Sequence, residues 1–325
     1  MVWSDTPLAR RLGLRFPIIQ APMAGGLSTP ALTAAVGSAG GLGSIAGAQY
    51  SPEQLRTAIA EVRARTDAPF AVNLFAPLPG PATDRVGAWS ELTGVPFAGP
   101  PNIPDVAEQL AVIAAERVPV FSFTFGIPAL DGVDAIRIGT ATTLAEAVAL
   151  ERAGVDAVVA QGYEAGGHRG TFLEPVDRSL FGTLTLLAQL VPAVSVPVIA
   201  SGGIMDGRGI AAALALGAQA VQLGTAFLRC PEAGTPDRHR DALGGDTIIT
   251  RVLTGRAARA VRTPLIDRLE ASGLEPPDYP LPRALSPEPP MLAGQSGRLA
   301  RSVPAGDLIA ILAAETTEAI ARLST

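Results

Sequence analysis

Cysteine and long uninterrupted apolar segments are scarce in this chain, and each shortage excludes a class of protein. The single cysteine, Cys230, allows neither an internal disulfide framework nor a cysteine-based metal site. It precedes a proline in an expected loop, so we interpret it as an incidental thiol. Apolar stretches such as 111–125 are interrupted by charge or proline well before they reach the length of a membrane span. The N-terminus also lacks the apolar core of a signal peptide, which predicts a cytoplasmic location.

Charged residues are also few, at 17% of the 325 residues against 48% hydrophobic residues, so the chain can bury a large core. The formal net charge of −5 argues against a general nucleic-acid-binding surface, although it says nothing about a small local anion site. The composition therefore predicts a soluble globular protein with neither nucleic acid nor a membrane as its partner.

Short apolar runs recur along the chain at regular intervals. They cover residues 17–21, 41–46, 69–73, 118–123, 134–138, 156–161, 196–200 and 219–223, and such runs are typical of buried parallel strands. Helical patterns lie between them, and eight strands alternating with helices favour a closed (β/α)8 TIM barrel over a doubly wound sheet. The fold class is therefore α/β.

Capping signals mark where the helices begin and end. Thr29 is followed by proline, and capping boxes are expected at 51–54 and 143–146. Gly154 and Gly217 stand where a helix would end through a left-handed residue. Both glycines lead into a predicted strand, so the same helix-to-strand turn is expected twice.

Such a barrel needs roughly 250 residues, and two segments account for the additional length of this chain. Residues 74–105 hold seven prolines and are expected to form a long loop over the barrel mouth. Residues 229–290 contain helical patterns at "GGDTIITRVLTG" and "TPLIDRLEASG", which predicts an inserted helical subdomain, with 1–228 and 291–325 forming the barrel. Only about ten residues separate the fourth and fifth strands, so the helix between them should be reduced to a turn.

The chemistry of a TIM barrel gathers at the carboxyl ends of its strands. The first strand leads into Met23 and two glycines, the third ends at Asn73, and the sixth ends at Gln161 just before "AGGH". After the seventh and eighth strands come "ASGGI" and "QLGTAF", whose backbone N–H groups and hydroxyls could bind a phosphate without any lysine. Taken one at a time, these features need no ligand, because glycines occur in tight turns and an amide can cap a loop. Together they favour a planar phosphate-bearing ligand, and a flavin fits that description.

Several segments resemble one known family. They are "PIIQAPMAGGLSTP", "GGLGSIAGAQYSP", "VDAVVAQGYEAGGHRGTF", "VIASGGI", "VQLGTAFL" and "AGQSG". This set resembles the nitronate monooxygenases, formerly called 2-nitropropane dioxygenases, and specifically the bacterial and fungal class that carries AGGH. The stretch "TGRAARAVR" also resembles part of the family's second domain, although by itself it indicates a solvated helix face.

The resemblance implies FMN bound noncovalently at the barrel mouth and the oxidation of alkyl nitronates, propionate 3-nitronate among them, by molecular oxygen. It makes His168 the catalytic histidine, names Gln295 as a further candidate lining residue, implies no metal and leaves a homodimer open. The residues that it places against FMN are Met23, Asn73, Gln161, Gly166, Gly167, Gly202, Gly203, Gln222, Leu223, Gly224 and Thr225.

A histidine suits the position after two glycines because Gly166 and Gly167 would let the backbone approach the flavin closely and turn His168 toward it. With an ordinary pKa near 6.5, the imidazole could remove the α proton of a neutral nitroalkane or, once charged, hold an anionic nitronate. The other histidine, His239, lies within the charged sequence "PDRHRD" and is expected to be exposed to solvent.

Other functions stay open at this point. Flavin-dependent enoyl-acyl-carrier-protein reductases and NADH:quinone reductases share the resemblance, FMN and a histidine after the sixth strand. A barrel related to inosine monophosphate dehydrogenase needs a nucleophilic cysteine near that strand, whereas Cys230 follows the eighth. A catalytically silent flavin-binding barrel is a further alternative. The short connection between the fourth and fifth strands is where this chain departs from the family, which affects any substrate contact within 123–127.

Overall fold

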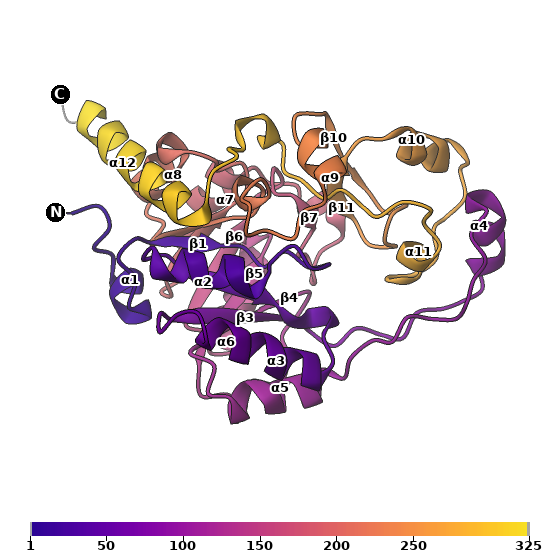
Figure 1. Ribbon diagram of the computed structural model, residues 1–325, viewed down its shortest axis with the longest axis horizontal. Coiled ribbons are helices and arrows are strands. Elements are labelled where there is room, and N and C mark those ends of the chain that lie inside the picture. Colours follow the sequence, from indigo (N-terminus) through magenta and orange to yellow (C-terminus); the bar gives the residue numbers. More distant parts are fainter. Residues whose placement is uncertain (1, 324–325) are drawn as a thin grey trace.

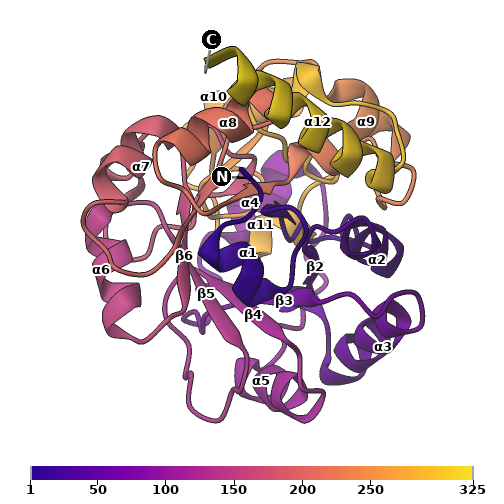
Figure 2. The ribbon, with the colours of Figure 1, turned by 90° about the vertical axis from the view of Figure 1, so that its left-hand side faces the viewer.

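The computed structural model describes residues 2–323, and within that range eight parallel strands form one sheet. The strands are β1 (Ile18–Gln20), β2 (Gly43–Ala46), β3 (Phe70–Phe75), β4 (Val120–Thr124), β5 (Ile136–Ala141), β6 (Ala157–Gln161), β8 (Val198–Ser201) and β9 (Ala220–Leu223). The sheet runs in the order β1-β9-β8-β6-β5-β4-β3-β2. Leu42, just before β2, hydrogen-bonds to Ile18 and Gln20 and so joins the two edges. All eight predicted strands and the (β/α)8 barrel are confirmed (Figure 2).

A ring of helices covers the outside of the barrel. Its members are α2 (Pro30–Ser38), α3 (Pro52–Arg63), α5 (Val106–Ala115), α6 (Leu144–Arg152), α7 (Thr183–Leu190), α8 (Gly207–Ala215) and α12 (Ala305–Leu323). The last helix, α12, packs on α8 and α2 and closes the ring. Residues 125–135 contain no helix, so the predicted reduction of the connection between β4 and β5 is confirmed. None of the helices in the described range is long and apolar enough to span a bilayer.

A short helix, α1 (Pro7–Leu12), covers the end of the barrel where the strands begin (Figure 2). Leu8 and Leu12 belong to one apolar cluster with Leu42 and with side chains of the strands, which are Ile19, Ala71, Val120, Ile138, Ala157, Val159, Ile199 and Ala220. Because this apolar layer fills the barrel at that end, a ligand can approach the barrel interior only from the end where the strands finish.

The helix termini follow the predicted capping chemistry with one exception. Ser51 forms a full capping box with Gln54, and Gly154 and Gly217 adopt left-handed φ angles of 82° and 92°. Thr143 caps α6 as expected, but the reciprocal bond is absent. The Glu146 carboxylate instead accepts hydrogen bonds from the backbone and hydroxyl of Thr142, each at 2.7 Å. The predicted capping box at 143–146 is therefore wrong, because Thr142 and donors of residues 171–173 occupy both carboxylate oxygens of Glu146.

The segment 229–290 is not purely helical. It contains α9 (Asp237–Ala242), α10 (Pro264–Ala271) and α11 (Leu281–Ala284), and also the strands β10 (Thr247–Thr250) and β11 (Ala258–Val261). The helix predicted within 244–255 is thus wrong, since the β-branched run "TIIT" pairs antiparallel with β11. The exposed helix face predicted for 254–262 is wrong as well, because β11 is fully buried and Arg259 is 2% exposed.

Two parts of the barrel chain contact this segment. The strand β7 (Gly167–His168), which follows β6, pairs with β11. The predicted loop 74–105 contains a helix, α4 (Val86–Thr93), which corrects the expectation of a structureless loop. Trp89 and Val86 of α4 pack against Leu253, Leu265 and Ile266. Figure 1 accordingly shows α4 beside α10 and α11, far from the helices of the barrel ring. Short 3-10 turns cover Gly47–Gln49, Val176–Arg178, Thr225–Phe227 and Gly297–Leu299.

Candidate active site

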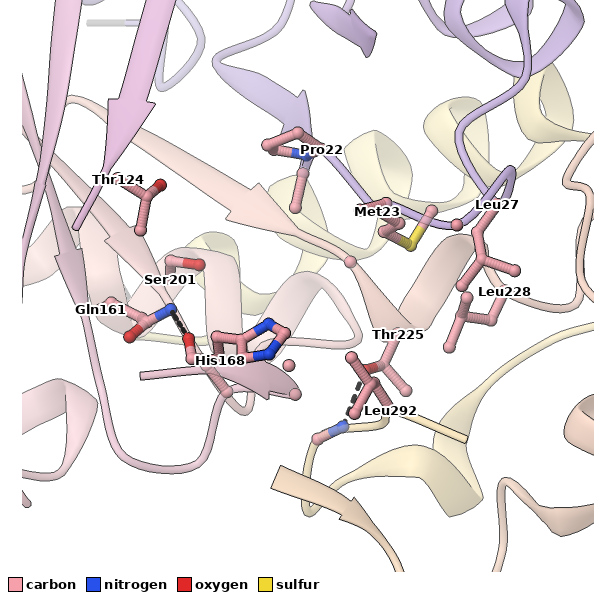
Figure 3. A pocket seen from close by; sticks show the side chains of 18 of the residues that line it. Pro22, Met23, Leu27, Thr124, Gln161, His168, Ser201, Thr225, Leu228 and Leu292 are labelled. Atoms are coloured by element: carbon pink, nitrogen blue, oxygen red, sulfur yellow. Dashed lines mark hydrogen bonds between the residues drawn. The ribbon is translucent and has the colours of Figure 1, made fainter. Parts of the chain in front are cut away.

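A cavity of about 290 Å³ opens at the carboxyl ends of the barrel strands (Figure 3), and residues between 236 and 292 complete its wall. All of the residues predicted to contact a cofactor line it, together with His168. The set is Met23, Asn73, Gln161, Gly166, Gly167, Gly202, Gly203, Gln222, Leu223, Gly224 and Thr225. The structure therefore brings residues from five different strand ends together around one space. Gln295 lies outside the lining, where its amide donates to the Tyr163 hydroxyl at 3.3 Å.

The two glycines before His168 are needed for different reasons. A Cβ on Gly166 would lie 2.5 Å from the backbone nitrogen of Gly294, so this residue is small because segment 293–294 packs directly on it. Gly167 has a left-handed φ of 80°, and a Cβ there would meet no atom within 4 Å. Only Gly167 therefore combines a backbone demand with open space beside it, which is the arrangement that a close-lying ligand requires.

Buried and partly buried hydrogen bonds hold the loop between β6 and β7 in place. Gln161 donates to the backbone carbonyl of His168 at 3.0 Å and accepts from Gly170 and Arg169 at 2.9 and 3.1 Å. The Arg169 guanidinium, 1% exposed, also donates to the carbonyls of Gly162 and Ser179. The amide oxygen of Gln161 is thus fully used by the loop, and only one of its N–H donors is left for a ligand.

Asn73 is the second carboxamide of the cavity wall. Its amide nitrogen donates to the Ser122 hydroxyl at 3.0 Å, and the residue is 4% exposed. Its amide oxygen has no hydrogen bond to a described residue and is not among the enclosed unpartnered atoms. That oxygen therefore meets the cavity and can accept a hydrogen bond from a ligand.

The turns after β8 and β9 contribute mainly backbone. Gly202 and Gly203 adopt positive φ angles of 121° and 73°, and a Cβ on Gly202 would lie 2.8 Å from the Thr183 hydroxyl. Glu164 fixes this region by accepting from the Thr183 backbone and hydroxyl at 2.9–3.0 Å. The Thr225 hydroxyl accepts from the backbone of Gly294 at 2.9 Å. These contacts fix the turns, and the backbone of 202–203 and 224–225 lines the cavity.

His168 is held between two aromatic rings. The ring centroids of Phe125 and Tyr279 lie 5.8 and 5.5 Å from that of His168, with interplanar angles of 90° and 88°. Phe125 adopts a positive φ of 77°, which is a genuine strain for a bulky residue. Its position directly after β4 places its ring in the cavity wall, where the Arg256 guanidinium lies 4.0 Å from the ring centroid.

The cavity is electropositive. Burial, with the positive charges of Arg256 and Arg283, lowers the pKa of His168 to about 3. An imidazole with this pKa is neutral at physiological pH, so the positive charge beside it comes from the arginines. None of the described residues that line the cavity is an aspartate or glutamate, whereas Arg283 and Arg238 are among them, and Arg238 forms an ion pair with Glu288. Such a site favours an anionic ligand.

His239 corrects an expectation. It is 4% exposed, not solvated, and its Nε2 lies 3.1 Å from the carbonyl oxygen of Leu292, to which it donates. Asp237 and Asp241, two of the charged neighbours that suggested exposure, are exposed, whereas the helix α9 turns His239 inward to the cavity wall. Cys230 is fully buried, and burial beside Glu232 raises the pKa of its thiol to about 12, which agrees with an incidental role.

Sequence reasoning missed several lining residues. Phe75, Phe125, Thr254, Tyr279 and Arg283 all border the cavity. Thr254 lies in the misassigned stretch before β11, and the last two lie in a proline-rich segment without periodicity. A second cavity of about 390 Å³ adjoins the first, and Phe75, Tyr279 and Arg283 line both. Within the described chain, no group of three or more histidine, cysteine or carboxylate side chains is placed to hold a metal ion.

The barrel and its cavity define an enzyme of the TIM-barrel class, and comparison with known proteins gives its family. A model of the nitronate monooxygenases matches residues 7–315. The chain is 44% identical to a nitronate monooxygenase of Pseudomonas aeruginosa, with 94% of this chain and 97% of that protein covered. The chain belongs to the nitronate monooxygenase family, whose members are flavoprotein oxidoreductases.

Solved structures support the same family and fold. A nitroalkane oxidase from Streptomyces ansochromogenes superposes with a TM-score of 0.90 at 39% identity, covering 97% of this chain and 99% of that one. FabK from Thermotoga maritima superposes with a TM-score of 0.76 at 30% identity, covering 98% of each chain. The predicted family, fold and enzyme class are thereby confirmed.

Proposed function

We propose that this protein is an FMN-dependent nitronate monooxygenase that oxidises alkyl nitronates, propionate 3-nitronate among them, with molecular oxygen. One observation carries the proposal within the family. The cavity combines arginines and a neutral imidazole with a wall that contains no carboxylate among the described lining residues. A nitronate is an anion at neutral pH, so a site of this charge binds it in the form that is oxidised.

The residues present fit FMN. Gly167 leaves open space beside a left-handed backbone, Asn73 offers a free amide oxygen, and the turns at 202–203 and 224–225 present backbone donors where TIM barrels commonly bind phosphate. We assign FMN contacts to these residues and to Met23, Gln161, Gly166, Gln222 and Leu223. When bound, the flavin supplies the electron acceptor that oxygen regenerates. A cytoplasmic location and a homodimer stay predictions.

The chain's own groups have distinct tasks in this proposal. Arg283, which lines the cavity and whose charge acts on His168, attracts the anionic substrate. Phe125, Tyr279 and the adjacent turns enclose the reacting end of the substrate and exclude water. His168 is neutral and can accept the α proton of a nitroalkane, whereas a nitronate has already lost that proton.

The test is oxygen consumption by flavin-loaded protein. We expect consumption with propionate 3-nitronate or propyl nitronate, and no dependence on NADH. Rapid oxidation of NADH with quinone or an enoyl thioester, without nitronate turnover, would instead support the reductase alternative. Protein that purifies colourless and does not rebind FMN would support a catalytically silent barrel.

The variant His168→Ala tests the role of the imidazole. Because the flavin contacts assigned above lie on other residues, the variant should keep its flavin. Turnover of a neutral nitroalkane should fall by about two to four orders of magnitude, the usual contribution of a general base. Unchanged nitroalkane turnover in flavin-loaded His168→Ala would remove His168 from the mechanism.

A further inference from the structure

The hydroxyl of Thr254 lies between two groups of the site. Its Oγ1 is 3.0 Å from Nε2 of His168 and 3.0 Å from the backbone carbonyl oxygen of Arg256. Thr254 is 2% exposed and lies in the turn that joins β10 to β11, far from His168 in sequence. The contact is therefore a tertiary one, made when β7 pairs with β11.

The number of available hydrogens decides which group donates in each of these two hydrogen bonds. A carbonyl oxygen can only accept, and a threonine hydroxyl carries one hydrogen. The Arg256 carbonyl accepts no other hydrogen bond from a described residue, so the hydroxyl hydrogen is directed to it. Both bonds then exist only if Nε2 of His168 carries a proton and donates it to Thr254. A neutral imidazole with Nε2 protonated has an unprotonated Nδ1.

The remaining ring nitrogen is turned to the cavity. Nδ1 of His168 has no hydrogen bond to a described residue, yet it is not among the enclosed unpartnered side-chain atoms. Since His168 lines the cavity, Nδ1 meets its open space. The edge contacts with Phe125 and Tyr279 prevent the ring from turning freely, so the orientation set by Thr254 is maintained.

We propose that Thr254 is a positioning residue that fixes His168 in the Nε2-protonated tautomer and leaves the Nδ1 lone pair facing the substrate. The inference rests on the proposed function. In the deprotonation of a nitroalkane, the C–H bond at the α carbon breaks, its proton passes to Nδ1, and its electron pair stays on the substrate as the nitronate. A nitronate has already lost this proton and does not need the step. Thr254 should therefore affect nitroalkanes more than nitronates.

The tautomer can be read directly, because the chain has only two histidines. In protein labelled with ¹⁵N at histidine, protonated and unprotonated ring nitrogens give well-separated NMR shifts. We expect His168 in flavin-loaded and flavin-free protein to show a protonated Nε2 and an unprotonated Nδ1. His239, whose Nε2 donates to Leu292, is an internal reference that should keep the same tautomer in every variant.

The variants are Thr254→Val, which keeps the shape and removes the hydroxyl, and Thr254→Ser, which restores it. In Thr254→Val the Nε2 proton loses its buried acceptor, so the other tautomer, which can donate to water in the cavity, should become populated. We expect the ratio of kcat/KM for nitroethane to kcat/KM for ethyl nitronate to fall by about tenfold, the effect of one hydrogen bond. Thr254→Ser should restore both the ratio and the His168 signals.

Three results would overturn the inference. They are a protonated Nδ1 in the wild-type protein, an unchanged tautomer and substrate ratio in Thr254→Val, or an equal loss with both substrates that Thr254→Ser does not rescue. A failure of the proposed function looks different. In that case neither substrate is turned over, while the ¹⁵N signals still report the tautomer.

Discussion

At the scale of single residues, the neutral state of His168 lowers the free energy of unfolding at acidic pH. Burial and two nearby arginines hold its folded-state pKa at about 3, whereas the unfolded chain has an ordinary value near 6.5. Below pH 6.5 the unfolded chain thus binds a proton that the folded chain does not. The free energy of unfolding should therefore fall as the pH is lowered from about 6.5 toward 3, by at most about 1.4 kcal/mol per pH unit from this residue.

Urea unfolding at pH 7, 6 and 5 measures this slope. His168→Gln, which keeps an N–H donor for Thr254 but does not titrate, should show a shallower decline than the wild type. His239→Gln is the matched comparison, because burial also lowers the pKa of His239 and its removal should reduce the slope in the same direction. Equal slopes in His168→Gln and the wild type would show that His168 is not held neutral by the fold.

Gly224 allows a residue-scale test of the cofactor site. A Cβ there would lie 3.4 Å from the Ala21 Cβ and 3.8 Å from the Met23 sulfur, and the φ angle of −106° suits any residue. Gly224→Val should therefore fold, yet its branched side chain should fill the space assigned to the phosphate and abolish flavin retention. Gly80→Val, at an open position outside the cavity, should retain flavin. Flavin retained at full occupancy in Gly224→Val would contradict the phosphate assignment.

At the scale of elements, Glu146 connects α6 to residues 171–173, which follow β7. This fully buried carboxylate accepts from Thr142, from the Thr171 hydroxyl and from the backbones of Phe172 and Leu173. Glu146→Gln would place an N–H₂ group among these donors. We expect a loss of about 1–3 kcal/mol in the free energy of unfolding, because buried donors lose their acceptor.

The exposed helix residue Glu91 provides the control. Glu91→Gln should change the free energy of unfolding by less than about 0.5 kcal/mol, as is usual for surface positions. Denaturant curves of both variants give the comparison. A Glu146→Gln protein as stable as Glu91→Gln would mean that the carboxylate network contributes nothing to the fold.

The same elements show how far the sequence could be interpreted. The barrel strands were predictable because each is a continuous apolar run bounded by turns, and the strand ends located Asn73, Gln161 and His168. The strands within 244–262 were not predictable, because short strands in an insertion carry no distinct periodicity. Their positions are fixed by the pairing of β10 with β11 and of β11 with β7. Thr254 was missed for that reason, and the strained Phe125 left no signal in the sequence.

At the scale of the whole molecule, bulk charge and site charge are independent. The chain has a net charge of −5, yet its cavity wall holds arginines and no described carboxylate. The sequence contains no lysine, so every one of its 25 basic side chains is a guanidinium. A guanidinium stays charged when it is partly buried and can bind planar anions through two parallel donors. We therefore expect an anionic substrate to bind in this cavity, where the charge of Arg283 acts beside His168.

The most direct test of this account is anaerobic mixing of the flavin-loaded protein with propyl nitronate, followed by the visible absorbance of the oxidised flavin. We predict that the absorbance is lost with propyl nitronate and persists with an equal concentration of NADH. Loss of the absorbance with NADH, and none with propyl nitronate, would contradict the account.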